Sequence, residues 1–320
     1  MDDEMKVSVI CNAYNHEKYI KDTLESLVMQ KTSFPYEILV HDDASSDHTP
    51  DIIRTFEEKY PELIRPIYQT ENQYSKKNGA VAEIQLGRAK GKYIALCEGD
   101  DYWTDADKLQ KQYDALECHP DLDICVHAAI AVKANTKKYI RNIAPKDYDT
   151  IIPVEEVIAG GGEYVATNSI MYRKSLNDFI PPFRKELSLD YTLQIHGSLR
   201  GGMLYLKDVM SAYRQFADNS WTSRQKANAD IRKKNILTVI HMLESLDHDT
   251  DLRYHDVITG EIIKLEFVFY ETENNYKKLK DSRYHAIFSN ISFKHRLLLC
   301  LKHYAPWLVK LKRYINESKI

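Results

Sequence analysis

Residues 94–103 read IALCEGDDYW, an apolar run that ends in three carboxylates, one glycine and two aromatic residues. Acidic side chains at the mouth of a buried strand repel one another and lose hydration, so they need a partner there. Carboxylate oxygens are the ligands that Mg²⁺ and Mn²⁺ prefer, and these ions also bind the phosphates of nucleotides. The stretch therefore predicts a strand that ends at a divalent cation, with a diphosphate as the expected ligand.

A helix N-terminus is the alternative interpretation of the same acids, because TDADKLQKQ (104–112) begins a helix and carboxylates are favourable at its first turn. One cap needs one acid, whereas Glu98, Asp100 and Asp101 are three acids in four positions. Asp101 stays open between the two interpretations.

Strands and helices alternate on the N-terminal side of this stretch. Predicted strands are residues 6–12 (KVSVICN), 36–40 (YEILV), 64–68 and 92–97, and predicted helices start at Lys18, at Thr49-Pro50 as N-cap and first position, and at Ala80. This alternation predicts a parallel sheet with right-handed crossovers, whose ligand site lies beyond the carboxyl ends of the strands. The loops at those ends, NAYNHE (12–17), HDDASSD (41–47) and EGDDYWTD (98–105), should converge on one edge of the sheet.

The second half of the chain continues the sheet and then changes character. Further strands are predicted at 124–132 (ICVHAAIAV), 163–174 (EYVATNSIMYRK) and 203–214 (MLYLKDVMSAYR), and long amphipathic helices at 232–246 and 257–280. The fold class is α/β, a Rossmann-like sheet with a C-terminal helical appendage. The expected division is a catalytic domain over 1–221, a helical appendage over 222–285 and a basic amphipathic tail over 286–320.

Composition excludes several function classes. The chain has 320 residues, 43% of them hydrophobic, and a formal net charge of -3. The overall charge therefore does not favour binding to nucleic acid. Five cysteines without CxxC spacing fit reduced thiols and no zinc site. No signal peptide and no run of about 18 apolar residues is present, so we expect a cytoplasmic protein that does not span a membrane.

The ordered set VSVICNAYN, ILVHDDASSDHTPDII and AKGKYIALCEGDDYWTDADKLQKQ resembles the family 2 glycosyltransferases, whose fold is called GT-A, over about residues 5–220. The resemblance implies that Asp42 or Asp43 contacts the nucleoside and that Ala13, Tyr14 and Glu17 border the base and ribose. Glu98-Gly99-Asp100 stands where the family has its Asp-x-Asp motif, with Asp100 as the metal ligand. Glu98 keeps the charge with a longer reach, and is assigned to the metal or to the ribose.

The resemblance also implies a catalytic base. Asp190, in ELSLDYTLQI, stands where family members carry an aspartate at the head of a helix, the residue that deprotonates the acceptor hydroxyl; a plain N-cap, Asp190 or Ser188, is the alternative. Thr167, Asn168, Ser169, Asp101 and Trp103 are assigned to the acceptor side, although short polar residues at a strand edge are often structural.

The chain departs from the family's pattern at Phe216, where relatives often have a histidine that binds the metal. Either Asp100, diphosphate and water suffice, or another residue such as His41 compensates. Arg214 has two interpretations, a contact to diphosphate or an ion pair with an acid. Lys76 and Lys77 are expected to be solvated.

The tail, SFKHRLLLCLKHYAPWLVKLKRYI (292–315), combines leucine and aromatic residues with lysine and arginine, and Glu317 is the only acid from residue 292 onward. This composition is typical of helices that lie on an anionic membrane, and Pro306 should divide the segment into two short helices. The alternative is a terminal helix packed on the core or on a second subunit.

The sequence therefore predicts a Mn²⁺- or Mg²⁺-dependent inverting glycosyltransferase that moves a sugar from a nucleotide diphosphate sugar, such as a UDP-sugar, to a glycan or lipid-linked acceptor, as in surface polysaccharide synthesis. The expected location is the cytoplasm, with a peripheral site on the inner face of the cell membrane as a hypothesis, and a homo-oligomer is left open. A sugar-1-phosphate nucleotidyltransferase is the enzymatic alternative, but its glycine-rich, basic phosphate loop is missing after the first strand. A nucleotide-sugar-binding scaffold without catalysis is the third reading.

Overall fold

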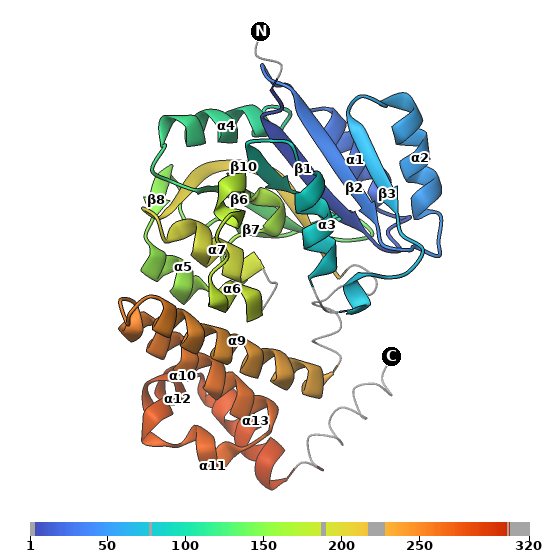
Figure 1. The fold of residues 1–320 in the computed structure, drawn as a ribbon. Helices are drawn as coiled ribbons and strands as arrows, with labels where there is room; N and C mark the ends of the chain where they lie inside the picture. Colours follow the sequence, from blue (N-terminus) through green and yellow to red (C-terminus); the bar gives the residue numbers. More distant parts are fainter. Residues whose placement is uncertain (1–3, 77–78, 187–189, 217–227, 306, 308–320) are drawn as a thin grey trace. The chain divides into compact units, whose positions relative to one another are not determined.

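The computed structural model describes residues 4–76, 79–186, 190–216, 228–305 and 307 (Figure 1). The chain divides into two compact units, Met1–Thr222 and Ser223–Ile320. Each unit has its own hydrophobic core. The three-segment division predicted from the sequence stays a prediction.

The N-terminal half of the first unit's sheet is parallel. Strands β1 (Val7–Ala13), β2 (Tyr36–Asp42), β3 (Ile64–Tyr68) and β4 (Tyr93–Leu96) lie in the order β3-β2-β1-β4. Residues on both faces of β1 and β2 are buried, which is why their sequences are nearly continuous apolar runs. The four strands predicted here are confirmed, each with its end shifted by no more than two residues.

The other half of the sheet is mixed, which corrects the expectation of a parallel sheet. Strand β9 (Met171–Arg173) pairs antiparallel with both β4 and β6 (Ile124–Lys133), whereas β10 (Met203–Gln215) runs parallel to β6. The short strands β5 (Tyr102–Trp103), β7 (Tyr139–Ile143) and β8 (Thr150–Ile152) are antiparallel to their neighbours. Only the end of the strand predicted at 163–174 forms, because Thr167–Ser169 are a 3₁₀ helix, η2.

Helices cover the sheet of the first unit: α1 (Ile20–Val28), α2 (Thr49–Lys59), α3 (Ala80–Arg88), α4 (Lys108–Cys118), α5 (Val154–Gly160), α6 (Pro182–Glu186) and α7 (Asp190–Ser198), with short 3₁₀ turns η1 (Tyr74–Lys76) and η3 (Lys174–Asn177). In α1 the apolar residues Ile20, Leu24 and Leu27 fall on one face and are fully buried. The prediction that Thr49 is the N-cap of α2 is wrong: Thr49 is already helical, and the Asp47 carboxylate accepts a hydrogen bond from its backbone N–H at 2.9 Å.

The second unit is helical in its described part. It contains α9 (Ala229–Asp249), α10 (His255–Thr272), α11 (Tyr276–Leu279), η4 (Ser282–Tyr284), α12 (His285–Asn290) and α13 (Phe293–Tyr304). Phe267, Leu279, Tyr284 and Leu299 form its core, so α13 packs against α10 and α11 through Leu299. Among the described helices, none has the length and apolar character that crossing a membrane requires. The predicted break at Pro306 lies outside the described residues.

Candidate functional site

The loops after β1 and β2 are tied to one another by hydrogen bonds. The backbone N–H of Asn15 donates to Ser45 Oγ at 2.9 Å, and the N–H of Ser46 donates to Asn15 Oδ1 at 2.8 Å. Asn15 has a left-handed backbone, with φ of 56°, a conformation that asparagine tolerates well. Glu17 completes the connection, because its N–H donates to Asp47 and its carboxylate accepts from the N–H of His48, each at 3.1 Å. The two loops therefore form one rim at the carboxyl ends of their strands.

The acidic loop after β4 lies directly against the first of these loops. The N–H of Gly99 donates to the carbonyl of Asn12 at 2.8 Å. A Cβ atom on Gly99 would lie 2.8 Å from Nδ1 of His16 and 3.0 Å from Cβ of Ala13, closer than real Cβ contacts. Glycine is thus required by close approach of two loops, and the predicted convergence of the three loops is confirmed.

Two acids of the loop after β4, Glu98 and Asp100, and one distant acid, Asp190, repel one another at this edge. Burial raises the pKa of Glu98 to about 8, and the neighbouring carboxylates of Asp190 and then Asp100 add to the rise, against a hydrogen bond with Asn12. Burial raises the pKa of the Cys11 thiol in β1, and the carboxylates of Glu98, Asp100 and Asp101 add to the rise. The structure therefore brings Asp190, about 90 residues away in sequence, next to the acidic loop.

Asp190 begins α7, as the sequence predicted for the head of a helix. The hydroxyl of Thr167 donates to its Oδ2 atom. The surrounding protein raises the pKa of Asp190 by displacing water, although part of the side chain is exposed to solvent. Thr167 and Asp190 thus form a pair with a fixed carboxylate orientation. Ser188, the alternative cap, lies outside the described residues.

Asp101 supports the site from behind. The side chain is 1% exposed, its Oδ1 accepts from the N–H of Arg214 at 2.7 Å, and its Oδ2 accepts from the Asn168 amide at 3.0 Å. Burial and the neighbouring Asp100 raise its pKa despite these bonds. Both oxygens accept hydrogen bonds from within the protein, which favours a structural role for Asp101; its assignment to the acceptor side stays a prediction.

Trp103, Asn168 and Ser169 are buried as well, which favours a structural role; their assignment to the acceptor side stays a prediction. The indole N–H of Trp103 donates to the carbonyl of Asn168 at 2.9 Å, and the ring is 1% exposed. Asn168 also accepts from Ser211 Oγ at 2.7 Å. The hydroxyl of Ser169 donates to the carbonyl of Ala166 at 2.6 Å. A 3₁₀ turn whose polar groups bond inward holds the acidic loop in place, and only Thr167 of the predicted acceptor triplet has a side chain that is partly exposed.

The two acids of the second loop differ in what they can bind. Both carboxylate oxygens of Asp43 accept hydrogen bonds within the protein, from the N–H groups of Gln73 at 2.7 Å and Tyr74 at 3.0 Å. Asp42 Oδ1 is buried and has no hydrogen-bond partner, and burial raises the pKa of this carboxyl. A buried acceptor without a donor is costly, so Asp42 is the member of the pair that is free for a ligand. Tyr14 is 46% exposed beside it, whereas Ala13 is buried.

His41, Arg214 and Lys76 all have partners within the protein. His41 is fully buried with its Nε2 atom 3.3 Å from Asp43, so it gives no substitute for the imidazole missing at Phe216. Arg214 is 1% exposed, pairs with Asp22 and donates to the carbonyl of Asp100 at 2.8 Å, which favours the ion-pair interpretation. Lys76 pairs with Glu71 at 3.1 Å at the surface, and Lys77 lies outside the described residues.

Sequence reasoning missed Asn12, His16 and Thr23. The hydroxyl of Thr23 contacts the carbonyls of Gly99 at 3.0 Å and Asp101 at 2.6 Å, from the middle of a helix where no local pattern marks it. His16 Nδ1 is buried without a hydrogen-bond partner beside Gly99. The polar loop 12–17 pointed to Asn12 and His16. The sequence did not show which of their atoms lie near the acids.

The acids of the loop after β4 are candidate ligands for a divalent cation. Among the described residues, no three His, Cys, Asp or Glu side chains form a group that could enclose a metal ion. Glu98 and Asp100 nevertheless repel each other, and the nearby Arg214 guanidinium bonds a backbone carbonyl and Asp22 instead of these two carboxylates. The donor set fits an ion such as Mg²⁺ or Mn²⁺ that takes one or two carboxylates and completes its coordination with phosphate and water.

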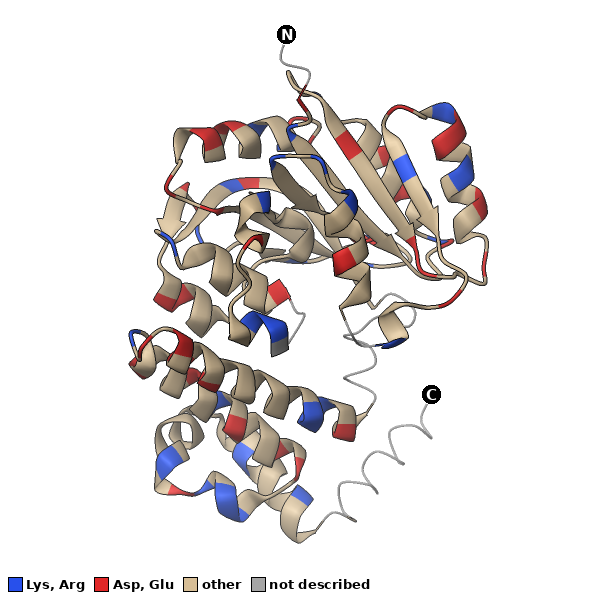
Figure 2. Cartoon of the chain, in the orientation of Figure 1, with Lys and Arg blue, Asp and Glu red and all other residues tan. Residues whose placement is uncertain are grey.

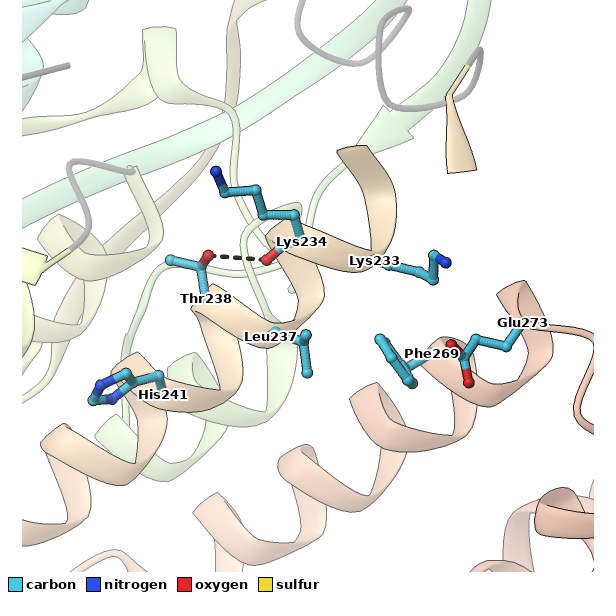
Figure 3. Close-up of a pocket in the computed structure, with 7 residues that line it drawn as sticks. All are labelled: Lys233, Lys234, Leu237, Thr238, His241, Phe269 and Glu273. Atoms are coloured by element: carbon cyan, nitrogen blue, oxygen red, sulfur yellow. Dashed lines mark hydrogen bonds between the residues drawn. The ribbon is translucent and has the colours of Figure 1, made fainter. Parts of the chain in front are cut away.

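A separate hollow of about 480 Å³ lies within the second unit (Figure 3). Lys233, Lys234, Leu237, Thr238 and His241 of α9 line it together with Phe269 and Glu273 of α10. It is wide open to solvent and contains none of the predicted site residues. It is therefore distinct from the candidate site formed by the loops of the first unit.

Comparison with known proteins gives consistent matches. Residues 8–214 match the model of glycosyl transferase family 2. The uncharacterized protein Rv1520 of Mycobacterium tuberculosis is 34% identical over 263 residues, 80% of this chain and 72% of that protein. The putative teichuronic acid biosynthesis glycosyltransferase TuaG of Bacillus subtilis is 42% identical over 110 residues, 34% of this chain and 40% of that protein.

Two solved structures share the fold. TarS residues 1–349 of Staphylococcus aureus, in complex with UDP-GlcNAc, superposes with a TM-score of 0.63 at 21% identity, over 88% of this chain and 78% of that one. The mannosyltransferase PcManGT of Pyrobaculum calidifontis, in complex with GDP-Man and Mn²⁺, has a TM-score of 0.56 at 14% identity, over 96% of this chain and 83% of that one. The chain belongs to glycosyl transferase family 2 and is a glycosyltransferase with a GT-A-like fold.

Proposed function

We propose that the chain is a divalent-metal-dependent, inverting glycosyltransferase that moves a sugar from a nucleotide diphosphate sugar, with UDP as the nucleotide, to a hydroxyl of a glycan or lipid-linked acceptor, as in surface polysaccharide synthesis. The observation that carries the proposal is the link from Asp190 to the acidic loop through η2: Thr167 donates to the Asp190 carboxylate, and the next residue, Asn168, donates to Asp101 at 3.0 Å. This link supports the roles we propose, with Asp190 as the base for the acceptor and the acidic loop as the source of ligands for the donor.

The donor side is formed by the first two loops. Asp42 Oδ1, buried and unpaired, suits an N–H group of a nucleobase, and the exposed Tyr14 ring suits contact with the face of that base. Glu17 and Ala13 border the same rim. Solved relatives hold UDP-GlcNAc, UDP or GDP-Man, which supports a nucleotide sugar as donor without fixing the base.

Asp100, together with Glu98, would hold the metal ion, which when bound supplies positive charge to the diphosphate as it leaves. Gly99 lets the acidic loop lie against Asn12, so the two carboxylates project from a rigid turn. Thr23 and Arg214 hold the carbonyls of this turn from behind. These residues orient the acids and do not themselves take part in the transfer.

Asp190 acts on the acceptor. A sugar hydroxyl is a weak nucleophile near neutral pH, and a positioned carboxylate that takes its proton contributes about 10²- to 10⁴-fold to the rate. The acceptor oxygen forms a bond to the anomeric carbon while the bond from that carbon to the diphosphate oxygen breaks, and the hydroxyl proton moves to Asp190. The hydroxyl of Thr167 keeps one oxygen of Asp190 occupied, so the other oxygen faces the acceptor.

Separating the donor and acceptor roles tests this proposal. Binding of UDP-sugars and GDP-sugars with Mn²⁺ is measured by thermal shift and calorimetry, and turnover by release of the nucleotide diphosphate. We expect Asp100→Asn to abolish both binding and turnover, and Asp190→Asn to keep binding but lower turnover by at least about 10²-fold. Asp114→Asn, an exposed carboxylate on α4, is the matched control and should behave as the wild type.

Two results would contradict the proposal. Equal turnover of the wild type and Asp190→Asn would show that Asp190 is not the base. Full donor affinity without metal would show that donor binding does not depend on a metal ion. The family match argues against the nucleotidyltransferase and the catalytically inactive scaffold. The cytoplasmic location and a homo-oligomer stay predictions.

A further inference from the structure

The end of the second unit is strongly basic. Residues 276–305 contain one acid, Asp281, and seven lysine or arginine residues: Lys277, Lys278, Lys280, Arg283, Lys294, Arg296 and Lys302. Within the described part of this region, only Arg283 of these seven residues forms an ion pair with a carboxylate, that of Glu266 at 2.7 Å. Lys277, Lys278, Lys280 and Lys294 are exposed. Figure 2 colours lysine and arginine blue along the helices of this unit. This concentration contrasts with the net charge of -3 for the whole chain.

Helix α13 has two different faces. On the inner face Leu299 is 2% exposed in the core, His295 lies 2.9 Å from Glu271, and His303 lies 2.7 Å from the carbonyl of Asn274. On the outer face Phe293, Leu297 and Tyr304 are 72%, 48% and 61% exposed. Their spacing of four and seven residues puts these three side chains on one stripe of the helix.

This outer stripe is apolar where a solvent-facing helix surface is ordinarily polar. Leu298, 41% exposed, lies about 100° from Leu297 around the helix, and the exposed Lys294 lies between Leu298 and the stripe. Trp307, just past the helix, is 64% exposed. Large apolar and aromatic side chains flanked by lysine are the composition of helices that lie in the interface of a membrane. We call Phe293, Leu297, Leu298 and Tyr304 the α13 face.

We propose that the α13 face docks on a lipid bilayer with anionic headgroups, and that the lysines of α11 and α13 contact those headgroups. The charge decides between this partner and a second copy of the chain, because a second copy would bring two basic surfaces together. An anionic leaflet instead attracts each nearby lysine or arginine. The proposal concerns the second unit and is independent of the transfer reaction in the first.

Sedimentation of the full chain with vesicles tests the proposal. Vesicles of pure phosphatidylcholine are compared with vesicles that contain 30% phosphatidylglycerol. We expect binding to the anionic vesicles that weakens with salt, and at least about tenfold weaker binding for Phe293→Ser/Leu297→Ser. Lys277→Glu/Lys278→Glu should weaken binding to the anionic vesicles as well.

Ile231→Ser/Leu237→Ser is the matched control, because these α9 side chains are 41% and 52% exposed and lie outside the α13 face. Its binding should equal that of the wild type. Thermal unfolding and donor turnover of every variant show whether it is folded, and we expect both to be unchanged.

Three outcomes would overturn the proposal. They are the absence of binding to anionic vesicles, equal loss of binding in the control variant, and self-association without lipid that Phe293→Ser/Leu297→Ser abolishes. The last outcome would identify a second copy as the partner of the α13 face.

Discussion

Lys108 provides a sharp test of how burial controls charge in this fold. Its ammonium is fully buried at the start of α4, donates to Gln112 Oε1 at 2.7 Å, and lies 3.9 Å from the centre of the Trp103 ring. Burial lowers its pKa from 10.5 to about 7. The difference of about 3.5 corresponds to a cost of about 5 kcal/mol for keeping the folded chain protonated.

The sign of the effect follows from proton binding. Between pH 7 and pH 10.5 the unfolded chain holds a proton on Lys108 that the folded chain has released. The free energy of unfolding therefore rises with pH in this window, by about 2 kcal/mol between pH 7 and pH 9. Below pH 7 both states are protonated and the full cost of burial remains.

The assay is equilibrium unfolding in urea at pH 7, 8 and 9 for the wild type and Lys108→Met. The variant lacks this titration, so its stability relative to the wild type should fall by about 2 kcal/mol from pH 7 to pH 9. Lys138→Met, which removes an exposed lysine, is the control and should follow the wild type. Parallel pH dependence of the wild type and Lys108→Met would refute the reasoning, because other titrating groups are common to both.

Three more predictions concern the acidic loop. Gly99→Ala should lower the free energy of unfolding by about 1–3 kcal/mol in urea and weaken donor binding, because its Cβ would force the loop away from His16. Arg214→Met should cost about 1–3 kcal/mol by the same measurement, since it leaves the Asp100 carbonyl without its buried donor, whereas Asp22 keeps its ion pair with Lys137. Glu98→Gln should remove the loss of stability that the wild type shows as pH rises from about 4.5 to 8, because the raised pKa makes the ionised Glu98 unfavourable in the folded state; identical pH curves in thermal unfolding would contradict this.

The sequence predicted the sheet best where local pattern and topology agree. Strands β1, β2 and β4 are apolar runs followed by polar loops, and parallel neighbours place those loops together. The pattern gave no information on strand direction in the second half, where β9 runs antiparallel between β4 and β6. Residues 163–174 alternate as a strand does, but hydrogen bonds from Asn168 and Ser169 to distant or local carbonyls favour a 3₁₀ turn.

The candidate site was predictable in its location and less so in its roles. Adjacent acids look equivalent in sequence, yet Asp43 and Asp101 use both oxygens to accept from backbone and amide donors, whereas Asp42 accepts from Ser45 with one oxygen and keeps the other buried without a hydrogen-bond partner. Those donors come from Gln73, Asn168 and Arg214, which lie about 30 to 110 residues away. Only the fold decides which carboxylates are left for a ligand.

The hydroxyl of Thr23 lies within hydrogen-bond distance of the carbonyls of Gly99 and Asp101 and donates to one of them at a time, and Arg214 donates to the carbonyl of Asp100 between them. A turn held in this way has already lost its conformational entropy when the chain folds, so little of it remains to be lost when a donor arrives. Donor affinity can thus be changed from α1, by a substitution such as Thr23→Val that contacts no ligand. A loosened turn would be recognised by slower, multi-step donor association at unchanged nucleotide preference.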